Sequence, residues 1–316
     1  MRQQLPTRAL GRSGLHVTAM CMGTGGLGSV PELFGYDVPT ERAVNTVRRI
    51  LQGPFNFLDT SAIYSDGESE RRIGVALAET GGPPDGFVVA TKADRDSSTG
   101  DFSGAQVQKS VEGSLQRLGL DTLQLCYLHD PEHMSFEQGM APGGAVEALV
   151  ELQRQGVVKH LGVAGGPVDL MARYLRTGVF EVLITHNRWT LVDRSADGLL
   201  NEAVDLGVAV VNGAPFGGGI LAKGPAAVRD YAYRPADAEI MRRIEAMDEA
   251  CRRFGVPLAA AAVQFSLREP RITSTIVGVT RPERVDEAVD LAGHPVPDEL
   301  WEELEPLAAP RDSWLW

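Results

Sequence analysis

The chain has 316 residues, of which 43% are hydrophobic, and its 42 acidic side chains against 30 basic ones give a formal net charge of −12. This length suits one large core or two ordinary domains, and the negative charge argues against nucleic acid or an anionic membrane as the main partner. The N-terminal segment lacks the apolar run of a signal peptide, no run approaches the ~18 residues of a membrane span, and the cysteines lie far apart. We therefore expect a cytoplasmic protein with reduced thiols.

Short apolar runs alternate with amphipathic stretches along the chain. The apolar runs predict strands over 17–23, 55–59, 87–92, 122–129, 158–164, 180–185, 208–213 and 273–279. The stretches between them predict helices over 40–52, 69–79, 104–118, 143–156, 167–177, 197–206, 238–268 (with a break near 255–257) and 282–292. Eight strand–helix pairs fit an α/β fold of the (β/α)₈ TIM barrel type better than a doubly wound sheet, which more often has fewer strands. We expect residues 1–316 to form one domain, with an added C-terminal helix over 296–308 and a tail.

Gly23, Gly25 and Gly28 form a G-x-G-x-x-G pattern directly after the first predicted strand. A dinucleotide-binding Rossmann turn needs a helix that begins inside the pattern and an acidic residue about 20 positions further on. Here the next helix begins only near Thr40, and Asp59 lies too far along the chain. We therefore interpret these glycines as a flexible loop at the mouth of the barrel, where backbone can approach a ligand.

Chemically active side chains stand at the ends of three consecutive predicted strands. Asp59 ends the second strand and Tyr64 follows it, Lys92 ends the third and His129 ends the fourth. The C-terminal ends of barrel strands meet on one face, so these side chains are expected to lie together. The tyrosine can protonate a carbonyl oxygen or accept a proton from an alcohol, the lysine favours its phenolate, the aspartate anchors the lysine, and the histidine binds the substrate oxygen.

None of these four groups donates hydride well, so a reduction requires a cofactor. A metal site is the alternative for His129, because His133 lies close to it in the sequence. Pro131 interrupts a continuous helix between the two histidines and no third ligand is evident, so we predict that no metal is bound.

The segments "LDTSAIYSDGESERRIG", "ATK" and "YLHD" resemble the aldo-keto reductase superfamily. The resemblance extends over nearly the whole chain, through "ALGRSGLHVTAMCMGTGGLG", "HNRWTLVDRS", "GAPFGGGILAKG" and "TIVGVTRPERVDEAV". It implies a (β/α)₈ barrel that binds NAD or NADP, with Asp59, Tyr64, Lys92 and His129 as the catalytic tetrad and Tyr64 as the general acid/base. Within the superfamily the chain is most similar to the aldose dehydrogenase branch, which includes D-threo-aldose 1-dehydrogenase, L-fucose dehydrogenase and pyridoxal dehydrogenase.

The resemblance also implies a path for the cofactor across the strand ends, with a pyrophosphate passage along 213–224. The expected cofactor contacts are Gly23, Thr24, Asp59, His186, Ala214, Pro215, Phe216, Gly217, Gly218, Ile276, Gly278, Thr280 and Arg284. The expected substrate walls are Phe34 and its neighbours to Tyr36, Trp189, and the tail residues Trp314 and Trp316.

Several positions depart from the family pattern. Where many relatives hold the nicotinamide carboxamide with Ser-Asn and Gln, this chain has Ala164, Gly165 and His186, and Gly213 replaces a common stacking aromatic. The Lys-Ser pair that grips the 2′-phosphate of NADP aligns with 278–279, which are Gly and Val, although Arg284 is retained. Loss of this cation favours NAD or a relaxed preference.

We therefore predict an NAD(P)-dependent oxidoreductase acting on a small carbonyl/alcohol pair, first a sugar at its anomeric carbon and second an aldehyde or pyridoxal. Two alternatives stay open: a nicotinamide-binding regulatory subunit with the same barrel but no turnover, and a metal-dependent barrel hydrolase or isomerase. The substrate, the direction of the reaction and the oligomeric state are not fixed by the sequence.

Overall fold

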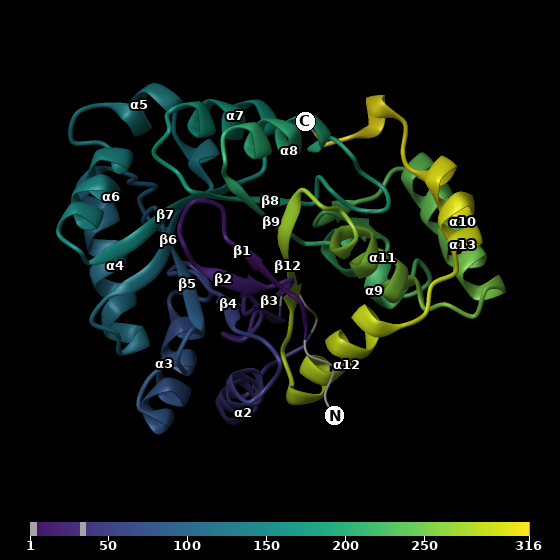
Figure 1. The fold of residues 1–316 in the computed structure, drawn as a ribbon, viewed down its shortest axis with the longest axis horizontal. Coiled ribbons are helices and arrows are strands. Elements are labelled where there is room, and N and C mark those ends of the chain that lie inside the picture. The colour runs from purple at the N-terminus through teal and green to yellow at the C-terminus, as the bar shows by residue number, and fades with distance from the viewer. Residues whose placement is uncertain (1–4, 32–35, 316) are drawn as a thin grey trace.

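The computed structural model describes residues 5–31 and 36–315 and contains a closed barrel of eight parallel strands (Figure 1). The strands follow one another around the barrel in chain order, with β12 closing against β3. This confirms the predicted (β/α)₈ barrel. The barrel strands are β3 (Met20–Gly23), β4 (Phe57–Asp59), β5 (Val88–Ala93), β6 (Leu123–His129), β7 (Val158–Gly165), β8 (Val182–His186), β9 (Ala209–Gly213) and β12 (Ile272–Gly278).

Helices surround this barrel, and most of them are amphipathic with one buried face. They are α2 (Thr40–Leu51), α3 (Glu68–Thr80), α4 (Gly104–Leu118), α6 (Ala145–Arg154), α7 (Val168–Arg176), α8 (Asp197–Asp205), α10 (Ala238–Arg253), α11 (Leu258–Leu267) and α12 (Pro282–Gly293). The predicted break between α10 and α11 is present, with Gly255 in the left-handed region and Pro257 at the N-cap. The added helix α13 (Asp298–Leu304) is shorter than predicted, because Pro297 precedes it and Pro306 lies in the 3₁₀ turn that ends it.

The first predicted strand is divided into two, which corrects the sequence-based bounds. Its beginning forms β2 (His16–Thr18), which pairs antiparallel with β1 (Thr7–Ala9), and only β3 enters the barrel. The side chain of Arg12, in the turn of this hairpin, donates to the carbonyl oxygens of Gly178 (2.7 Å) and Phe180 (3.0 Å). These carbonyls precede β8, so the hairpin covers the N-terminal end of the barrel and leaves the C-terminal end for chemistry.

Short elements between strands and helices were not predicted, because they are too short for a hydrophobic pattern to repeat. They are α5 (Phe136–Met140), α9 (Ile220–Lys223) and the two-residue strands β10 (Asp230–Tyr231) and β11 (Arg234–Pro235), together with several 3₁₀ turns. β10 and β11 pair with each other beside the loop after β9 and not within the barrel.

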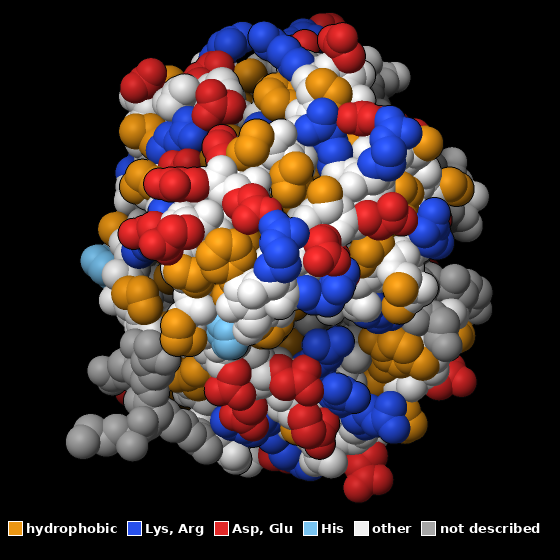
Figure 2. Space-filling view, turned by 90° about the vertical axis from the view of Figure 1, so that its right-hand side faces the viewer, with side chains coloured by type: hydrophobic (Ala, Val, Ile, Leu, Met, Phe, Trp, Pro, Cys, Tyr) orange, Lys and Arg blue, Asp and Glu red, His pale blue; other side chains and the backbone are white. Residues whose placement is uncertain are grey.

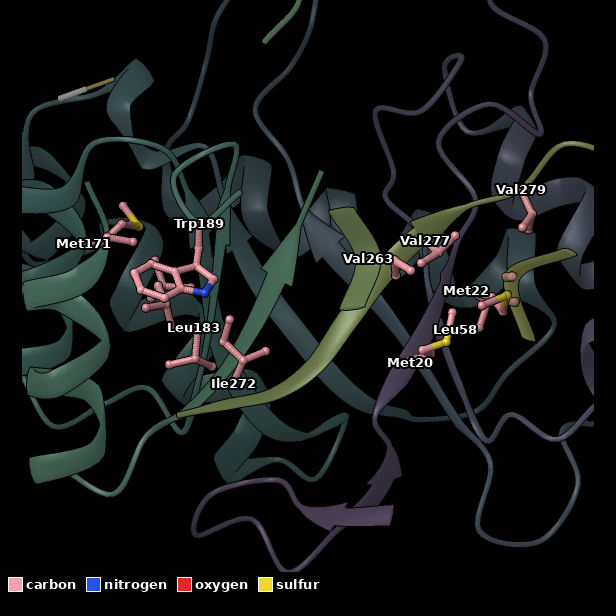
Figure 3. Close-up of a cluster of buried hydrophobic side chains, with 14 of the residues drawn as sticks. Met20, Met22, Leu58, Met171, Leu183, Trp189, Val263, Ile272, Val277 and Val279 are labelled. Carbon is pink, nitrogen blue, oxygen red and sulfur yellow. The ribbon is translucent and has the colours of Figure 1, made fainter. Parts of the chain in front are cut away.

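Two hydrophobic layers hold the barrel. The interior is filled by side chains such as Phe57, Leu125 and Tyr127, all fully buried, and each contributes roughly 1.5–3 kcal/mol of burial. A larger layer packs between strands and helices, and Figure 3 shows part of it, including Leu183 and Ile272. The three cysteines are unpaired and buried.

Among the described helices, none is long and apolar enough to cross a membrane. On the face drawn in Figure 2, acidic and basic side chains are interspersed, in keeping with the many ion pairs that link them across the surface.

Candidate active site

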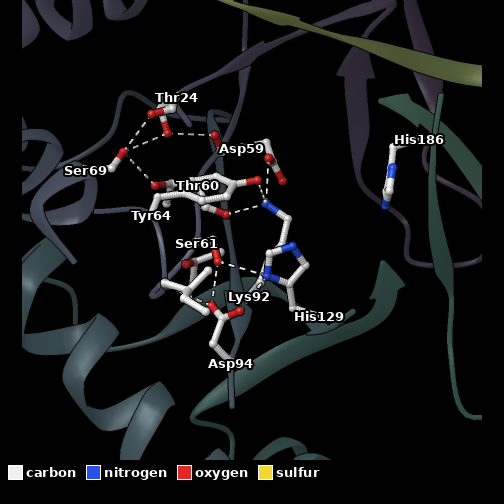
Figure 4. Close-up of polar contacts among 12 residues, drawn as sticks. Thr24, Asp59, Thr60, Ser61, Tyr64, Ser69, Lys92, Asp94, His129 and His186 are labelled. Atoms are coloured by element: carbon white, nitrogen blue, oxygen red, sulfur yellow. Dashed lines mark hydrogen bonds and ion pairs between the residues drawn. The ribbon is translucent and has the colours of Figure 1, made fainter. Parts of the chain in front are cut away.

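The four predicted side chains meet at the C-terminal end of the barrel (Figure 4). Asp59 and His129 are the last residues of β4 and β6, and Lys92 lies near the end of β5, opposite Tyr127 of β6. Tyr64 reaches the group from the turn between β4 and α3, where its backbone N–H donates to the carbonyl oxygen of Ser61 (3.2 Å). The parallel register of neighbouring strands therefore assembles the cluster that the sequence predicts.

Lys92 is the centre of this cluster. Its Nζ lies 2.7 Å from Oδ2 of Asp59, 2.6 Å from the carbonyl oxygen of Thr60 and 3.1 Å from the hydroxyl oxygen of Tyr64. Burial acts to lower the pKa of Lys92, but the nearby Asp59 and Tyr64 outweigh it and the pKa is raised. The ammonium is thus held charged with its three hydrogen atoms directed to three oxygens.

The Tyr64 hydroxyl group is protonated near neutral pH. Burial, the largest effect, raises the pKa of Tyr64, and Lys92 acts to lower it. The influence of Lys92 has the direction expected from the sequence, but burial outweighs it, so the expected bias toward phenolate is absent from the protein without ligand. The ring lies 4.6 Å from the Lys92 ammonium and approaches the backbone of Gly25 in the loop after β3.

His129 is held by a carboxylate that the sequence analysis missed. Its Nδ1 lies 2.5 Å from Oδ1 of Asp94, and the other oxygen of Asp94 accepts from the Ser61 hydroxyl (2.5 Å) and the Ile63 N–H (3.0 Å). The His129 ring meets the Tyr64 ring edge-on, with centroids 6.0 Å apart. The available signal was the position of Asp94, two residues after Lys92 and one residue beyond the end of β5, where the alternation of the strand directs both side chains to the same side if it continues.

A second histidine stands on the opposite side of the mouth. His186 ends β8, and its Nε2 lies 3.9 Å from Oδ1 of Asp130, which is also 3.7 Å from Nε2 of His129. Burial lowers the pKa of His186 to about 4, so the ring is neutral near pH 7. Ligand atoms of Asp130, Glu132 and His186 come within 4.8 Å of one another, whereas His133 is not part of this group.

Several predicted cofactor residues line the strand ends beside Tyr64. Gly23 at the end of β3 pairs with Gly278 at the end of β12, and Ile276 packs against Gly23 so closely that a Cβ there would meet its methyl group at 2.6 Å. Thr24 is fully buried and its hydroxyl donates to the carbonyl oxygen of Asp59 (2.9 Å). This bond holds the Thr24 side chain on β4, and the predicted cofactor contact of Thr24 stays a prediction.

The loop after β9 fits a pyrophosphate. Ala214 and the three glycines 217–219 all have positive φ angles, and a Cβ on Gly217 would meet the ring of Tyr231 at 2.4 Å. Pro215 and Phe216 lie within the same turn. A Cβ on Gly278, at the end of β12, would meet open space. The N–H groups of Gly217 and Gly219 donate within the loop, to the carbonyl oxygens of Ala214 and Phe216. The strip has few side chains, which leaves room for phosphate groups beside the backbone N–H groups of Phe216 and Gly218, so the residues present fit a nicotinamide dinucleotide.

At the expected adenosine end of the cofactor path, two arginine side chains bind the same carboxylate. Arg281 and Arg284 lie 3.1 and 3.0 Å from the two carboxylate oxygens of Glu287. Thr280 lies between Gly278 and these arginines in the sequence. Its Oγ1 is 3.0 Å from the hydroxyl oxygen of Tyr36, and the two groups form a hydrogen bond. The guanidinium groups near the expected adenosine end are therefore already neutralised in part.

The positions of Trp189 and Trp314 do not support the predicted substrate walls. Phe34 and Trp316 lie outside the described residues. Trp189 is 6% exposed and stacks on Phe265 in the outer core, a position that does not support its predicted substrate contact (Figure 3). Trp314 lines a cavity of about 480 Å³ between α7 and α8, with its indole N–H donating to the carbonyl oxygen of Ala309. This position does not support a substrate contact either.

Comparison with known proteins places the chain in a family. The aldo/keto reductase family model matches residues 19–309. L-galactose dehydrogenase of Arabidopsis thaliana is 31% identical over 99% of this chain and 97% of its own length. D-threo-aldose 1-dehydrogenase of a Pseudomonas species is 29% identical (94% and 95%), and pyridoxal 4-dehydrogenase of Microbacterium luteolum is 30% identical (94% and 96%). The holo form of an aldo-keto reductase from Bacillus halodurans superposes with a TM-score of 0.78 at 21% identity, over 98% of this chain and 99% of that one. The chain belongs to the aldo/keto reductase family of nicotinamide-dependent oxidoreductases.

Proposed function

We propose that this protein is an aldose 1-dehydrogenase that prefers NAD, or accepts both NAD and NADP, and that Tyr64 is its general acid/base. The observation that carries the proposal is the hydrogen bond of 3.1 Å between the Lys92 ammonium and the Tyr64 hydroxyl at the mouth of the barrel. A phenol beside a fixed cation can release and recover a proton, because the cation stabilises the phenolate as it forms.

Each side chain of the cluster has a distinct task in this proposal. In the oxidative direction Tyr64 accepts the proton of the substrate hydroxyl, and in the reverse direction it returns that proton to the carbonyl oxygen. Lys92 stabilises the phenolate, Asp59 holds the ammonium in place, and His129 donates a hydrogen bond to the substrate oxygen.

The cofactor would lie along the strip from Gly23 and Gly278 to the loop after β9, with His186 beside the nicotinamide. A bound nicotinamide supplies or accepts the hydride, which none of the protein side chains can do. The protein would hold it by backbone contacts at 214–218, and the buried surroundings of Asp59 and Lys92 would exclude water from the reacting carbon.

The preference for sugars rests on the named relatives. The printed names of three relatives specify L-galactose, a D-threo-aldose and pyridoxal. Two of these three are aldoses, and the open rim next to Asp130 and His186 carries polar groups that can bind hydroxyls. Another relative is named an NADH-specific methylglyoxal reductase, which agrees with the proposed use of NAD.

A substrate panel tests the proposal. Purified protein is assayed with aldoses, pyridoxal and simple alcohols in the presence of NAD or NADP, and with aldehydes in the presence of NADH or NADPH, by absorbance of the reduced cofactor. We expect oxidation of at least one aldose, faster with NAD than with NADP or equal with both. Cofactor binding without turnover over the whole panel would favour the regulatory subunit, and activity that is lost with a chelator would favour the metal-dependent alternative.

A further inference from the structure

Asp94 belongs to a buried chain of hydrogen bonds that ends on His129 (Figure 4). The Asp94 side chain is 7% exposed, and three donors converge on it: Nδ1–H of His129, the Ser61 hydroxyl and the Ile63 N–H. Its own backbone N–H donates to the Ser110 hydroxyl (3.0 Å), which fixes the end of β5 on α4. A carboxylate with this many donors is held in one orientation, and an ionised carboxylate accepts only, so Nδ1 of His129 must carry a hydrogen.

We infer that Asp94 is a positioning residue that keeps His129 as an imidazolium, with Nδ1–H bound to the carboxylate and Nε2–H left to reach the substrate oxygen. This inference rests on the proposed function and deepens it, since it assigns His129 a positive charge during the reaction. A neutral histidine with Nδ1–H would present a bare Nε2, which can accept a hydrogen bond but cannot donate one to a carbonyl oxygen.

The charges around His129 favour this state. The groups that face it are Asp94 and Lys92 from β5, Asp130 from the end of β6, Tyr64 from the turn after β4, Asp59 from β4 and His186 from β8. Burial acts to lower the pKa of His129, but Asp94 and then Asp130 outweigh it, and the pKa is raised. Burial acts to raise the pKa of Asp94, but His129, Ser61 and Ile63 outweigh it, and that pKa is lowered.

The charged His129 has a definite consequence for the chemistry. During carbonyl reduction the substrate oxygen gains negative charge, and an imidazolium beside it stabilises that charge while Tyr64 supplies the proton. His129 keeps its own proton throughout. Reduction therefore requires His129 in its protonated form, and the rate of reduction falls as the pH rises through the pKa of His129.

The first test reads the charge of His129 without relying on turnover. The protein is labelled with ¹⁵N at its six histidines, His129 is assigned from the spectrum of His129→Gln, and both ring nitrogens are followed with pH. We expect a titration midpoint above ~6.5 in the wild type, and a midpoint lower by about one unit or more in Asp94→Asn. A neutral His129 at pH 6 in the wild type, or an unchanged midpoint in Asp94→Asn, would overturn the inference.

The second test is a double-mutant cycle on the reduction rate. Asp94→Asn is expected to lower kcat about tenfold or more and to move the alkaline fall of kcat to lower pH, with KM for the cofactor unchanged. Asp94→Asn combined with His129→Gln should be no slower than His129→Gln alone, because Asp94 acts through His129. Additive losses in the double variant would assign Asp94 a merely structural role and contradict the inference.

Two further variants separate the effect of the Asp94 carboxylate on His129 from a general effect of charge and from a loss of folding. Asp85→Asn makes the same charge change on an exposed loop before β5 and should leave kcat and the His129 midpoint unchanged. Ser61→Ala removes one donor but keeps the carboxylate on His129, so the raised midpoint should persist even if Asp94→Asn does not fold. If the His129 titration midpoint is raised but the protein turns over no substrate, the proposed function is refuted and the charge assigned to His129 stands. If the protein turns over a substrate but His129 titrates at an ordinary midpoint, the proposed function stands and the assigned charge is refuted.

Discussion

Nζ of Lys92 lies 2.7 Å from Oδ2 of Asp59, and the two side chains are only 3% and 5% exposed. The second carboxylate oxygen of Asp59 has no hydrogen-bond partner among the described residues. Burial raises the pKa of Asp59, with Lys92 acting against it. A buried ion pair of this kind contributes little net stability, because desolvation offsets the attraction. The role of the Asp59–Lys92 pair is instead to fix the position of the ammonium beside Tyr64.

Lys92→Met is expected to destabilise the fold and abolish activity. The substitution leaves the Asp59 carboxylate buried without its cation, and removal of one partner of such a pair costs about 3–5 kcal/mol in the free energy of unfolding. Urea denaturation followed by circular dichroism measures this loss. Asp59→Leu combined with Lys92→Met should recover most of the stability but none of the activity. Glu79→Gln, which breaks an exposed ion pair with Arg48, is the control and should change stability little.

Tyr64→Phe is expected to lower kcat/KM by about 10²–10⁴-fold, the usual contribution of a general acid or base. The ring and its contacts are kept, so cofactor binding, measured by fluorescence titration, should stay within a factor of two or so of the wild type. Tyr174→Phe is a matched control, because the Tyr174 ring is buried against Phe136 and Phe180 and its hydroxyl has no partner among the described residues. Equal loss in both variants would contradict the assigned role of Tyr64.

The sequence correctly predicts those parts of the site whose positions follow from the general geometry of a parallel barrel. Strand ends of a parallel barrel meet on one face, so Asp59, Lys92 and His129 could be grouped from their positions alone. The helix break near Gly255 and Pro257 has a local signal instead, since glycine adopts the left-handed conformation found there and proline cannot continue a helix. The hairpin of β1 and β2 was not predicted, because it depends on contacts of Arg12 with carbonyls far along the chain.

Side-chain roles were harder to predict than positions. Asp94 carries no motif, and its partner His129 lies 35 residues away, so only the neighbouring strand brings them together. The sequence does not show that Trp189, an expected substrate wall, packs on Phe265 and is buried in the outer core. Whether a side chain points inward or outward in a loop depends on the tertiary contacts, which no periodicity records.

Gly162→Ala is expected to destabilise the barrel by about 1–3 kcal/mol through overpacking. A Cβ at this position of β7 would meet the ring of Tyr127 at 2.3 Å, and Tyr127 is fully buried inside the barrel. Gly198→Ala in α8 is the matched control, because a Cβ there meets nothing within 4 Å, and alanine favours a helix by roughly 0.5–1 kcal/mol. Thermal unfolding should show a lower Tm for the first variant and an equal or higher Tm for the second.

The pair of Asp94 and His129 predicts how stability depends on pH. The pKa of His129 is raised, so its contribution is complete below ~6.5 and is lost as the pH rises through the folded-state pKa. The pKa of Asp94 is lowered, so its contribution is present above ~3.9 and is lost as the pH falls through the folded-state pKa. The Tm difference between wild type and His129→Gln should therefore be largest between about pH 4 and 6.5 and shrink toward pH 9. A difference that grows with pH would contradict the charged pair.

Glu287 is expected to set the cofactor preference. Its carboxylate accepts from both Arg281 and Arg284, and the family resemblance implies that these arginines can bind the adenosine phosphate of NADP. Glu287→Gln removes the negative charge and leaves both guanidinium groups to bind phosphate, so the Kd for NADPH should fall several-fold, less than about tenfold for a rim charge. The Kd for NADH should change little, because NADH has no phosphate at this position.

Salt distinguishes this effect from a change in shape. Attraction of exposed charges is screened by ions, so the gain in NADPH affinity in Glu287→Gln should shrink between 0.02 and 0.5 M salt, as the Debye length falls from about 20 Å to about 4 Å. Glu299→Gln makes the same change on the exposed side of α13 and should leave both dissociation constants unaltered. Equal gains for NADH and NADPH in Glu287→Gln would mean that the acid blocks the site sterically, and its two arginine contacts would then not govern the choice of cofactor.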